Sequence, residues 1–108
     1  MQHSDLTQDH WNKFSFFEQM ANTGSEIERT IKWKNRNNKE YANLAFERAL
    51  ELLDLTIADE KNKTRLKEIV RVREALADYF VFDNEYKSSD QLWHNYFYAF
   101  SWAARINT

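Results

Sequence analysis

Apolar residues recur at helical spacing along most of the chain. Between residues 15 and 36 they alternate in steps of three and four, at Phe17, Met20, Gly24, Ile27 and Ile31, which places them on one helix face. Ser15 and Glu18 fit a capping box at the start of this helix. Gly24 either lets another helix approach closely or breaks this one. Because the pattern keeps its phase across Gly24, we expect one continuous helix over 15–36.

Three further segments have the same character. The second predicted helix, over 39–56, has apolar residues around more than half of its circumference, as a central helix should. They are Tyr41, Ala42, Ala45, Phe46, Ala49, Leu52 and Leu53. Thr64 is a suitable N-cap for a third helix over 64–82, and Ser88 with Gln91 fits a capping box for a fourth over 89–105. The polar connections are short, which predicts an all-α antiparallel bundle of four main helices.

The composition supports this fold class. One glycine and no proline among 108 residues cannot supply the tight turns of a β-sandwich or a barrel. A chain of this length forms one domain by default, so we expect a single helical-bundle domain over 1–108. Residues 1–12 are mostly polar, and we expect a mobile segment there unless Trp11 and Phe14 fold back onto the bundle.

Charge and cysteine content narrow the function classes. The net charge is -2, which gives no overall field favouring nucleic acid or an anionic membrane. The absence of cysteine excludes disulfides, thiolate metal sites and a cysteine nucleophile. No run approaches about 18 apolar residues, and the N-terminus lacks the apolar stretch of a signal peptide. We therefore expect a cytoplasmic protein with no membrane contact and no cofactor.

One stretch resembles part of a known repeat. The spacing of Ala42, Phe46 and Ala49 within YANLAFERALEL, after IKWKNRNN, resembles the second helix of a tetratricopeptide unit and the turn before it. Over residues 27–52 the resemblance implies a helical hairpin. Thr30 stands where the repeat usually has a small residue, Asp54 stands where it has proline, and no second copy follows. Since such arrays need about three repeats, the resemblance implies nothing about peptide binding.

A wider pattern covers residues 11–106. The segments ANTGSEIERTIKWKNRNN, AFERALELLDLTIAD, RLKEIVRVREALADYF and YFYAFSWAAR resemble an uncharacterised family of small all-helical prokaryotic proteins. The resemblance implies a prokaryotic origin. It carries no catalytic assignment.

Three charged residues fall on faces that are otherwise apolar. Arg73 lies near the centre of the apolar face of the third helix, Glu28 on the core side of the first, and Arg48 between Tyr41 and Leu55 on the second. They form either a structural salt-bridge cluster or arginine stems at the core edge with their charged groups in water. Alternatively, Arg48 and Arg73 hold a phosphate or carboxylate in a pocket between helices, with Glu28 nearby.

The one basic cluster surrounds a tryptophan at the first turn. It consists of Lys32, Trp33, Lys34, Arg36 and Lys39. Cations interleaved with an aromatic ring can hold single-stranded nucleic acid. The alternative is that these side chains complement the dipole at the C-terminal end of the first helix, and the acidic balance of the chain favours this reading.

Acidic and histidine side chains give little sign of chemistry. Glu51 and Asp54 have the ExxD spacing of all-helical, magnesium-dependent nucleotide hydrolases, but the earlier ExxE pair of those enzymes is missing. Asp90 and His94 are one helical turn apart, and no further metal ligand is implied. We predict no metal site and no catalytic residue, which weighs against an enzyme.

The fourth predicted helix has two apolar sides. Its core face is expected to hold Leu92, Trp93, Tyr96, Phe97, Phe100, Ala103 and Ala104. On another side Tyr98, Trp102 and Ile106 align at steps of four. Either the N-terminal aromatic residues cover Trp102, or the three side chains form an exposed patch of the kind that marks protein contacts.

The second reading of this helix gives the leading functional hypothesis. We expect a non-catalytic interaction protein that self-associates or docks a protein partner through the aromatic side of the fourth helix. A phosphate-ligand or nucleotide-handling protein using Arg48, Arg73 and Glu28 is the alternative. An RNA-associated accessory subunit, using the cluster around Trp33, is a weaker one.

Overall fold

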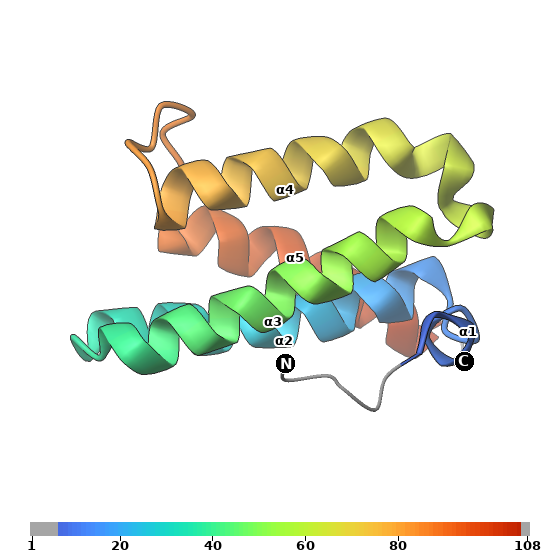
Figure 1. Cartoon of the computed structure of the whole chain (residues 1–108), viewed down its shortest axis with the longest axis horizontal. Coiled ribbons are helices and arrows are strands. Elements are labelled where there is room, and N and C mark those ends of the chain that lie inside the picture. The colour runs from blue at the N-terminus through green and yellow to red at the C-terminus, as the bar shows by residue number, and fades with distance from the viewer. Residues whose placement is uncertain (1–6, 107–108) are drawn as a thin grey trace.

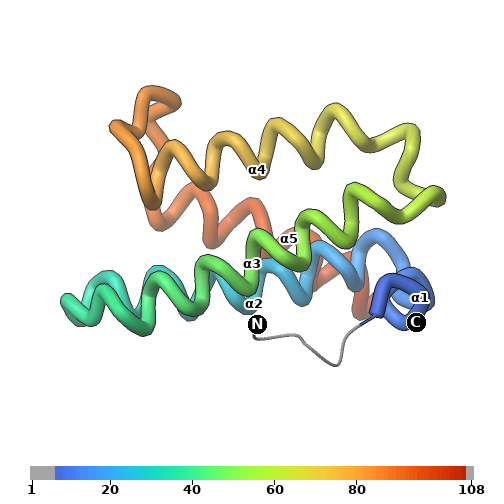
Figure 2. Tube along the Cα trace, viewed as in Figure 1, coloured from blue at the N-terminus to red at the C-terminus, as the bar shows by residue number. Residues whose placement is uncertain are grey.

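The computed structural model describes residues 7–106, and within them every regular element is a helix. In chain order these are α1 (Gln8–Trp11), α2 (Phe16–Asn35), α3 (Lys39–Ala58), the 3-10 helix η1 (Glu60–Arg65), α4 (Leu66–Phe80) and α5 (Asp90–Ile106). The four long helices run alternately in opposite directions (Figure 1). The trace in Figure 2 shows α2 and α3 side by side, with α5 against α2 and α4 against α3. The predicted all-α antiparallel bundle is confirmed.

Each long helix begins and ends within two residues of its predicted bounds, and a side-chain cap marks the start of α2. Both bonds of the predicted capping box form: the Ser15 amide donates to Glu18 Oε1 at 2.8 Å, and the Glu18 amide donates to Ser15 Oγ at 3.1 Å. Two predicted caps are wrong. Thr64 lies inside η1, so α4 begins without a side-chain cap. Ser89 rather than Ser88 caps α5, since both backbone groups of Ser88 bond the Asn84 side chain.

Gly24 sets the spacing between two helices. α2 is continuous through Gly24, as the sequence pattern predicts. The backbone at Gly24 lies so close to α5 that a Cβ atom there would be 2.7 Å from Cβ of Phe97 and 3.0 Å from its Cγ. Phe97 itself is buried and belongs to the main core cluster with Met20 and Ile27. The single glycine therefore lets α5 pack directly on the backbone of α2.

A buried polar network ties the start of the chain to the bundle. Gln19 has no exposed surface, and its Nε2 donates to the Trp11 carbonyl at 3.1 Å and to Asp59 Oδ2 at 2.8 Å. Asn62 Nδ2 donates to Gln19 Oε1 at 2.8 Å, and the Trp11 indole donates to Thr56 Oγ1 at 3.1 Å. Trp11 is therefore packed onto α3 and buried. Residues 1–6 of the predicted mobile segment lie outside the described residues.

The polar network predicts how the stability of the fold depends on pH. Burial opposes the ionised form of Asp59, but hydrogen bonds from Lys61 and Gln19 outweigh it and lower the pKa of Asp59 below the usual value. Such a carboxylate stabilises the fold above its unfolded pKa of about 3.9, and this contribution is lost as pH falls through the lower, folded value. In urea unfolding between pH 6 and 2, we expect Asp59→Asn to flatten the fall in wild-type stability below about pH 4. The exposed-site variant Asp83→Asn is the control, and an unchanged pH slope in Asp59→Asn would contradict this assignment.

Candidate functional site

The side of α5 that faces away from α2 is an uncharged, largely apolar surface. We call it the α5 outer face, and it consists of Leu92, Asn95, Tyr98, Ala99, Trp102 and Ile106. Tyr98, Trp102 and Ile106 are 58%, 54% and 60% exposed. Leu92, predicted on the core face, is 46% exposed instead, because Trp93 and Phe97 occupy the side of α5 that packs against the core. Nothing else in residues 7–106 buries this face.

Trp11 and Phe14, one of the two alternatives for the surroundings of Trp102, do not cover it. Trp11 is buried elsewhere, with its indole bonded to Thr56 on α3. Phe14 packs against Trp11 at a ring separation of 5.5 Å. The reading in which these residues shield Trp102 is therefore wrong, and over the described part of the chain the aromatic side of α5 is open to solvent.

Tyr98, a member of the α5 outer face, is supported by a contact that begins on α2. The His94 ring stacks on Tyr98 with centroids 6.1 Å apart and an interplanar angle of 22°. His94 Nδ1 lies 2.6 Å from Glu28 Oε2. The predicted position of Glu28 on the core side is wrong, because Glu28 is exposed and faces α5. Its role here is to orient His94, which in turn supports Tyr98.

The structure does not bring Glu28, Arg48 and Arg73 together. Arg73 is half-exposed on α4 and its Nε donates to Asp54 Oδ1 on α3 at 2.9 Å. Arg48 lines a small depression beside Trp33, and Glu28 lines another beside α5. Arg73 borders a third, at the far end of α4. For Arg73 this geometry agrees with the alternative in which the arginine stem lies at the edge of the core. No observation favours an anion pocket shared by the three residues.

The basic cluster of the sequence divides into two groups. Lys32 Nζ and the Arg36 guanidinium lie 5.2 and 5.5 Å from the centre of the Trp33 ring. Lys34 and Lys39 turn to the other side of the α2–α3 hairpin, where they border a cavity. The cluster is therefore not one continuous surface for nucleic acid.

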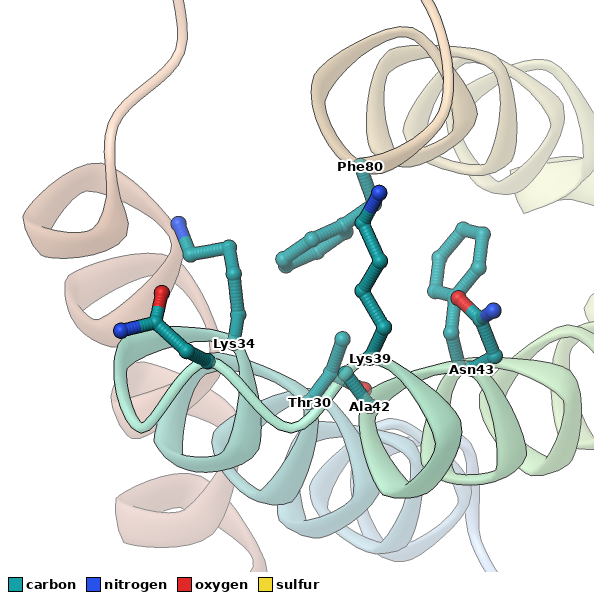
Figure 3. Close-up of a pocket in the computed structure, with 8 residues that line it drawn as sticks. Thr30, Lys34, Lys39, Ala42, Asn43 and Phe80 are labelled. Atoms are coloured by element: carbon teal, nitrogen blue, oxygen red, sulfur yellow. The ribbon is translucent and has the colours of Figure 1, made fainter.

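This cavity, which we call the hairpin pocket, lies between the turn joining α2 to α3 and the end of α4 (Figure 3). Its volume is about 450 Å³. Ala42, Phe46 and Phe80 form its apolar wall, and Lys34 with Lys39 stands at its rim. Sequence reasoning found the basic residues but not the pocket, because Phe80 reaches it only through the packing of α4 on α3.

Lys34 is fixed at the rim by two partners. Its Nζ donates to Asp90 Oδ1 at 2.6 Å and to the Tyr79 hydroxyl at 3.1 Å. Burial opposes the charged form of Lys34, but these hydrogen bonds outweigh it and raise its pKa. Burial also opposes the ionised form of Asp90, while bonds from Lys34, Tyr79 and Asn35 lower its pKa. Both groups are therefore charged at neutral pH, and Asp90 offsets the charge of Lys34.

The described residues contain no cluster of three or more potential metal-ligating side chains, and no helix among them is long and apolar enough to cross a membrane. The fold and its surfaces define an all-α bundle with one open apolar helix face and one basic pocket. No protein-family model matches the chain, and no curated protein or solved structure matches it either.

Proposed function

We propose that the protein is a non-catalytic helical-bundle interaction protein that pairs with a second copy of itself through the α5 outer face. The observation that carries this proposal is the exposure of Tyr98, Trp102 and Ile106 along one side of α5. Contiguous apolar surface of this kind is uncommon on a monomer and marks protein contacts. Aromatic side chains are also enriched at the centres of interfaces.

The spacing of the α5 outer face suits another helix. Its members Leu92, Asn95, Ala99, Trp102 and Ile106 follow steps of three and four. This is the spacing of the apolar seam between paired helices. None of these five residues is charged, so two copies can meet along them without like-charge repulsion.

These five residues are arranged nearly symmetrically about Ala99, which favours a second copy of the chain over a different protein as the partner. In a two-fold pair the same patch contributes from both sides. An antiparallel pair centred near Ala99 places Leu92 opposite Ile106 of the second copy, with the small alanine at the crossing. Asn95 then faces Trp102 of the second copy, where the amide oxygen can accept the indole N–H. The two helix dipoles oppose each other in this arrangement.

The expected dimer is weak. The 17 residues of α5 make a helix about 25 Å long. One face of such a helix is smaller than the roughly 800 Å² that each partner buries in a stable interface. We therefore expect a dissociation constant in the micromolar range.

Sedimentation equilibrium from about 5 to 500 µM tests the proposal. We expect a monomer–dimer equilibrium, and we expect Trp102→Ala to weaken it at least tenfold, because a central aromatic residue commonly contributes about 2 kcal/mol or more to an interface. Tyr86→Ala removes another aromatic ring that is more than half exposed and lies outside α5, and it is the matched control. A wild-type protein that stays monomeric throughout this range would overturn self-association.

A cross-link tests the register. The chain has no cysteine, so a single Ala99→Cys substitution introduces the only thiol. A residue near the two-fold axis should form an intermolecular disulfide under mild oxidation, whereas the exposed Ser25→Cys control on α2 should not. Equal cross-linking of the two variants would contradict the proposed pairing.

A further inference from the structure

We infer that the hairpin pocket binds a small organic anion whose apolar part is a flat ring. This binding site is separate from the α5 outer face and adds a ligand to the proposed interaction protein. The inference stands on the shape of the pocket, on the chemistry of its wall and on the charge at its rim.

The shape suits a small molecule. A volume of about 450 Å³ lies within the roughly 300–1,000 Å³ typical of ligand sites. The lining residues come from the end of α2, the start of α3 and the end of α4, so three packed segments enclose the space. The apolar residues that follow Phe80 do not fill it, because Val81 and Phe82 are turned to solvent.

The wall suits a flat ring. Phe46 and Phe80 lie side by side with ring centroids 5.2 Å apart and an interplanar angle of 51°. Phe46 and Ala42 are buried within the fold, and Phe80 is partly buried at its edge. An aromatic ligand can stack or pack edge-on against such a surface.

The rim supplies positive charge. The charge of Lys34 is largely offset by Asp90, as described above, whereas the side chain of Lys39 forms no hydrogen bond or ion pair within residues 7–106. Lys39 is also the first residue of α3, where the helix dipole adds a partial positive charge. Figure 3 shows Lys34 and Lys39 rising from the hairpin beside the pocket, with the Asn43 amide on its far side. An anionic group at the mouth would thus meet one uncompensated cation and a hydrogen-bonding amide.

The anionic group could be a carboxylate or a phosphate, since both accept hydrogen bonds and carry negative charge. NMR titration of the ¹⁵N-labelled protein distinguishes the two. The probes are adenosine 5′-monophosphate with neutral adenosine, and indole-3-acetate with neutral indole-3-acetamide. We expect at least one anion to shift the amide signals of Asn37, Lys39 and Asn43 with a dissociation constant of about 1 mM or tighter. The neutral analogue of that anion should bind at least fivefold more weakly. Binding of only one anion supports the inference and identifies the acidic group.

Three variants locate the binding. Lys39→Ala should weaken it at least fivefold and Lys39→Arg should retain it, while the control Lys67→Ala, an exposed lysine on α4, should leave it unchanged. Ala42→Leu should abolish binding by filling the pocket with both lysines intact. Because Lys39 is exposed, its variants are informative even if Ala42→Leu unfolds the protein. Three outcomes would each overturn the inference. They are the absence of saturable shifts with both anions at 10 mM, equally tight binding of the neutral analogues, and equal effects of Lys39→Ala and Lys67→Ala on binding.

Discussion

Gly24→Val is expected to lower the free energy of unfolding by about 3 kcal/mol, the upper end of the usual cost of overpacking. Even the first added carbon would lie 2.7 Å from Cβ of Phe97. That atom is attached directly to the α5 backbone, so no side-chain rotation can relieve the contact and the helix itself must move. For a domain of this size the loss corresponds to a fall in Tm of roughly 12–20 °C.

Gly24→Ala gives the sharper test because two effects oppose each other. Helix propensity alone predicts a gain of about 1 kcal/mol when alanine replaces glycine inside a helix. We expect the contact with Phe97 to outweigh this gain and to leave a net loss of about 1 kcal/mol in chemical denaturation. Ser25→Ala, at the neighbouring exposed position, should be neutral or slightly stabilising. A Gly24→Ala protein more stable than wild type would show that α5 does not need this close approach.

Removal of the Gln19 side chain is the second large effect. Gln19→Ala should lower the free energy of unfolding by about 3 kcal/mol, because three buried groups each lose a hydrogen bond and the truncation opens a cavity. The Trp11 carbonyl, Asp59 and Asn62 each lose their bond with Gln19. Each keeps another partner: the Phe14 amide for the Trp11 carbonyl, Lys61 for Asp59 and the Thr56 carbonyl for Asn62.

A matched variant lies on the same helix. The Asn22 amide is exposed and bonds only the Glu18 carbonyl among the described contacts, so Asn22→Ala should change stability by no more than about 0.5 kcal/mol. Urea unfolding of the two variants measures the difference. A cost below about 1 kcal/mol for Gln19→Ala would show that water or a rearranged side chain replaces the lost bonds.

The helices could be predicted because the information for them is local. The capping box at Ser15 and the phase of the apolar stripe across Gly24 lie within single segments, and both predictions are confirmed. The open side of α5 was predictable for the same reason, since Tyr98 and Trp102 share a face that the core pattern does not use. Predictions of this kind need only the helical period.

The remaining features depend on contacts between distant segments. The helical wheel placed Glu28 toward the core, but the packing of α5 at Gly24 directs Glu28 to His94 at the surface. The hairpin pocket needs Phe80 beside Phe46, which no local pattern reveals. A signal for the polar network did exist: Gln19 and Thr23 lie one position before two members of the apolar stripe, and both are buried. Because both side chains are polar, the hydrophobic pattern alone does not assign them to the core.

The same long-range contacts bear on how long a molecule stays folded. The bond from Trp11 to Thr56 spans 45 residues, and the bond from Gln19 to Asp59 spans 40. Closing such loops carries an entropy cost, so contacts between distant residues tend to form late in folding. Interactions that are absent from the folding transition state slow unfolding and barely change the folding rate. We therefore expect the polar network at the start of the bundle to act mainly by slowing unfolding, which would lengthen the lifetime of the native state.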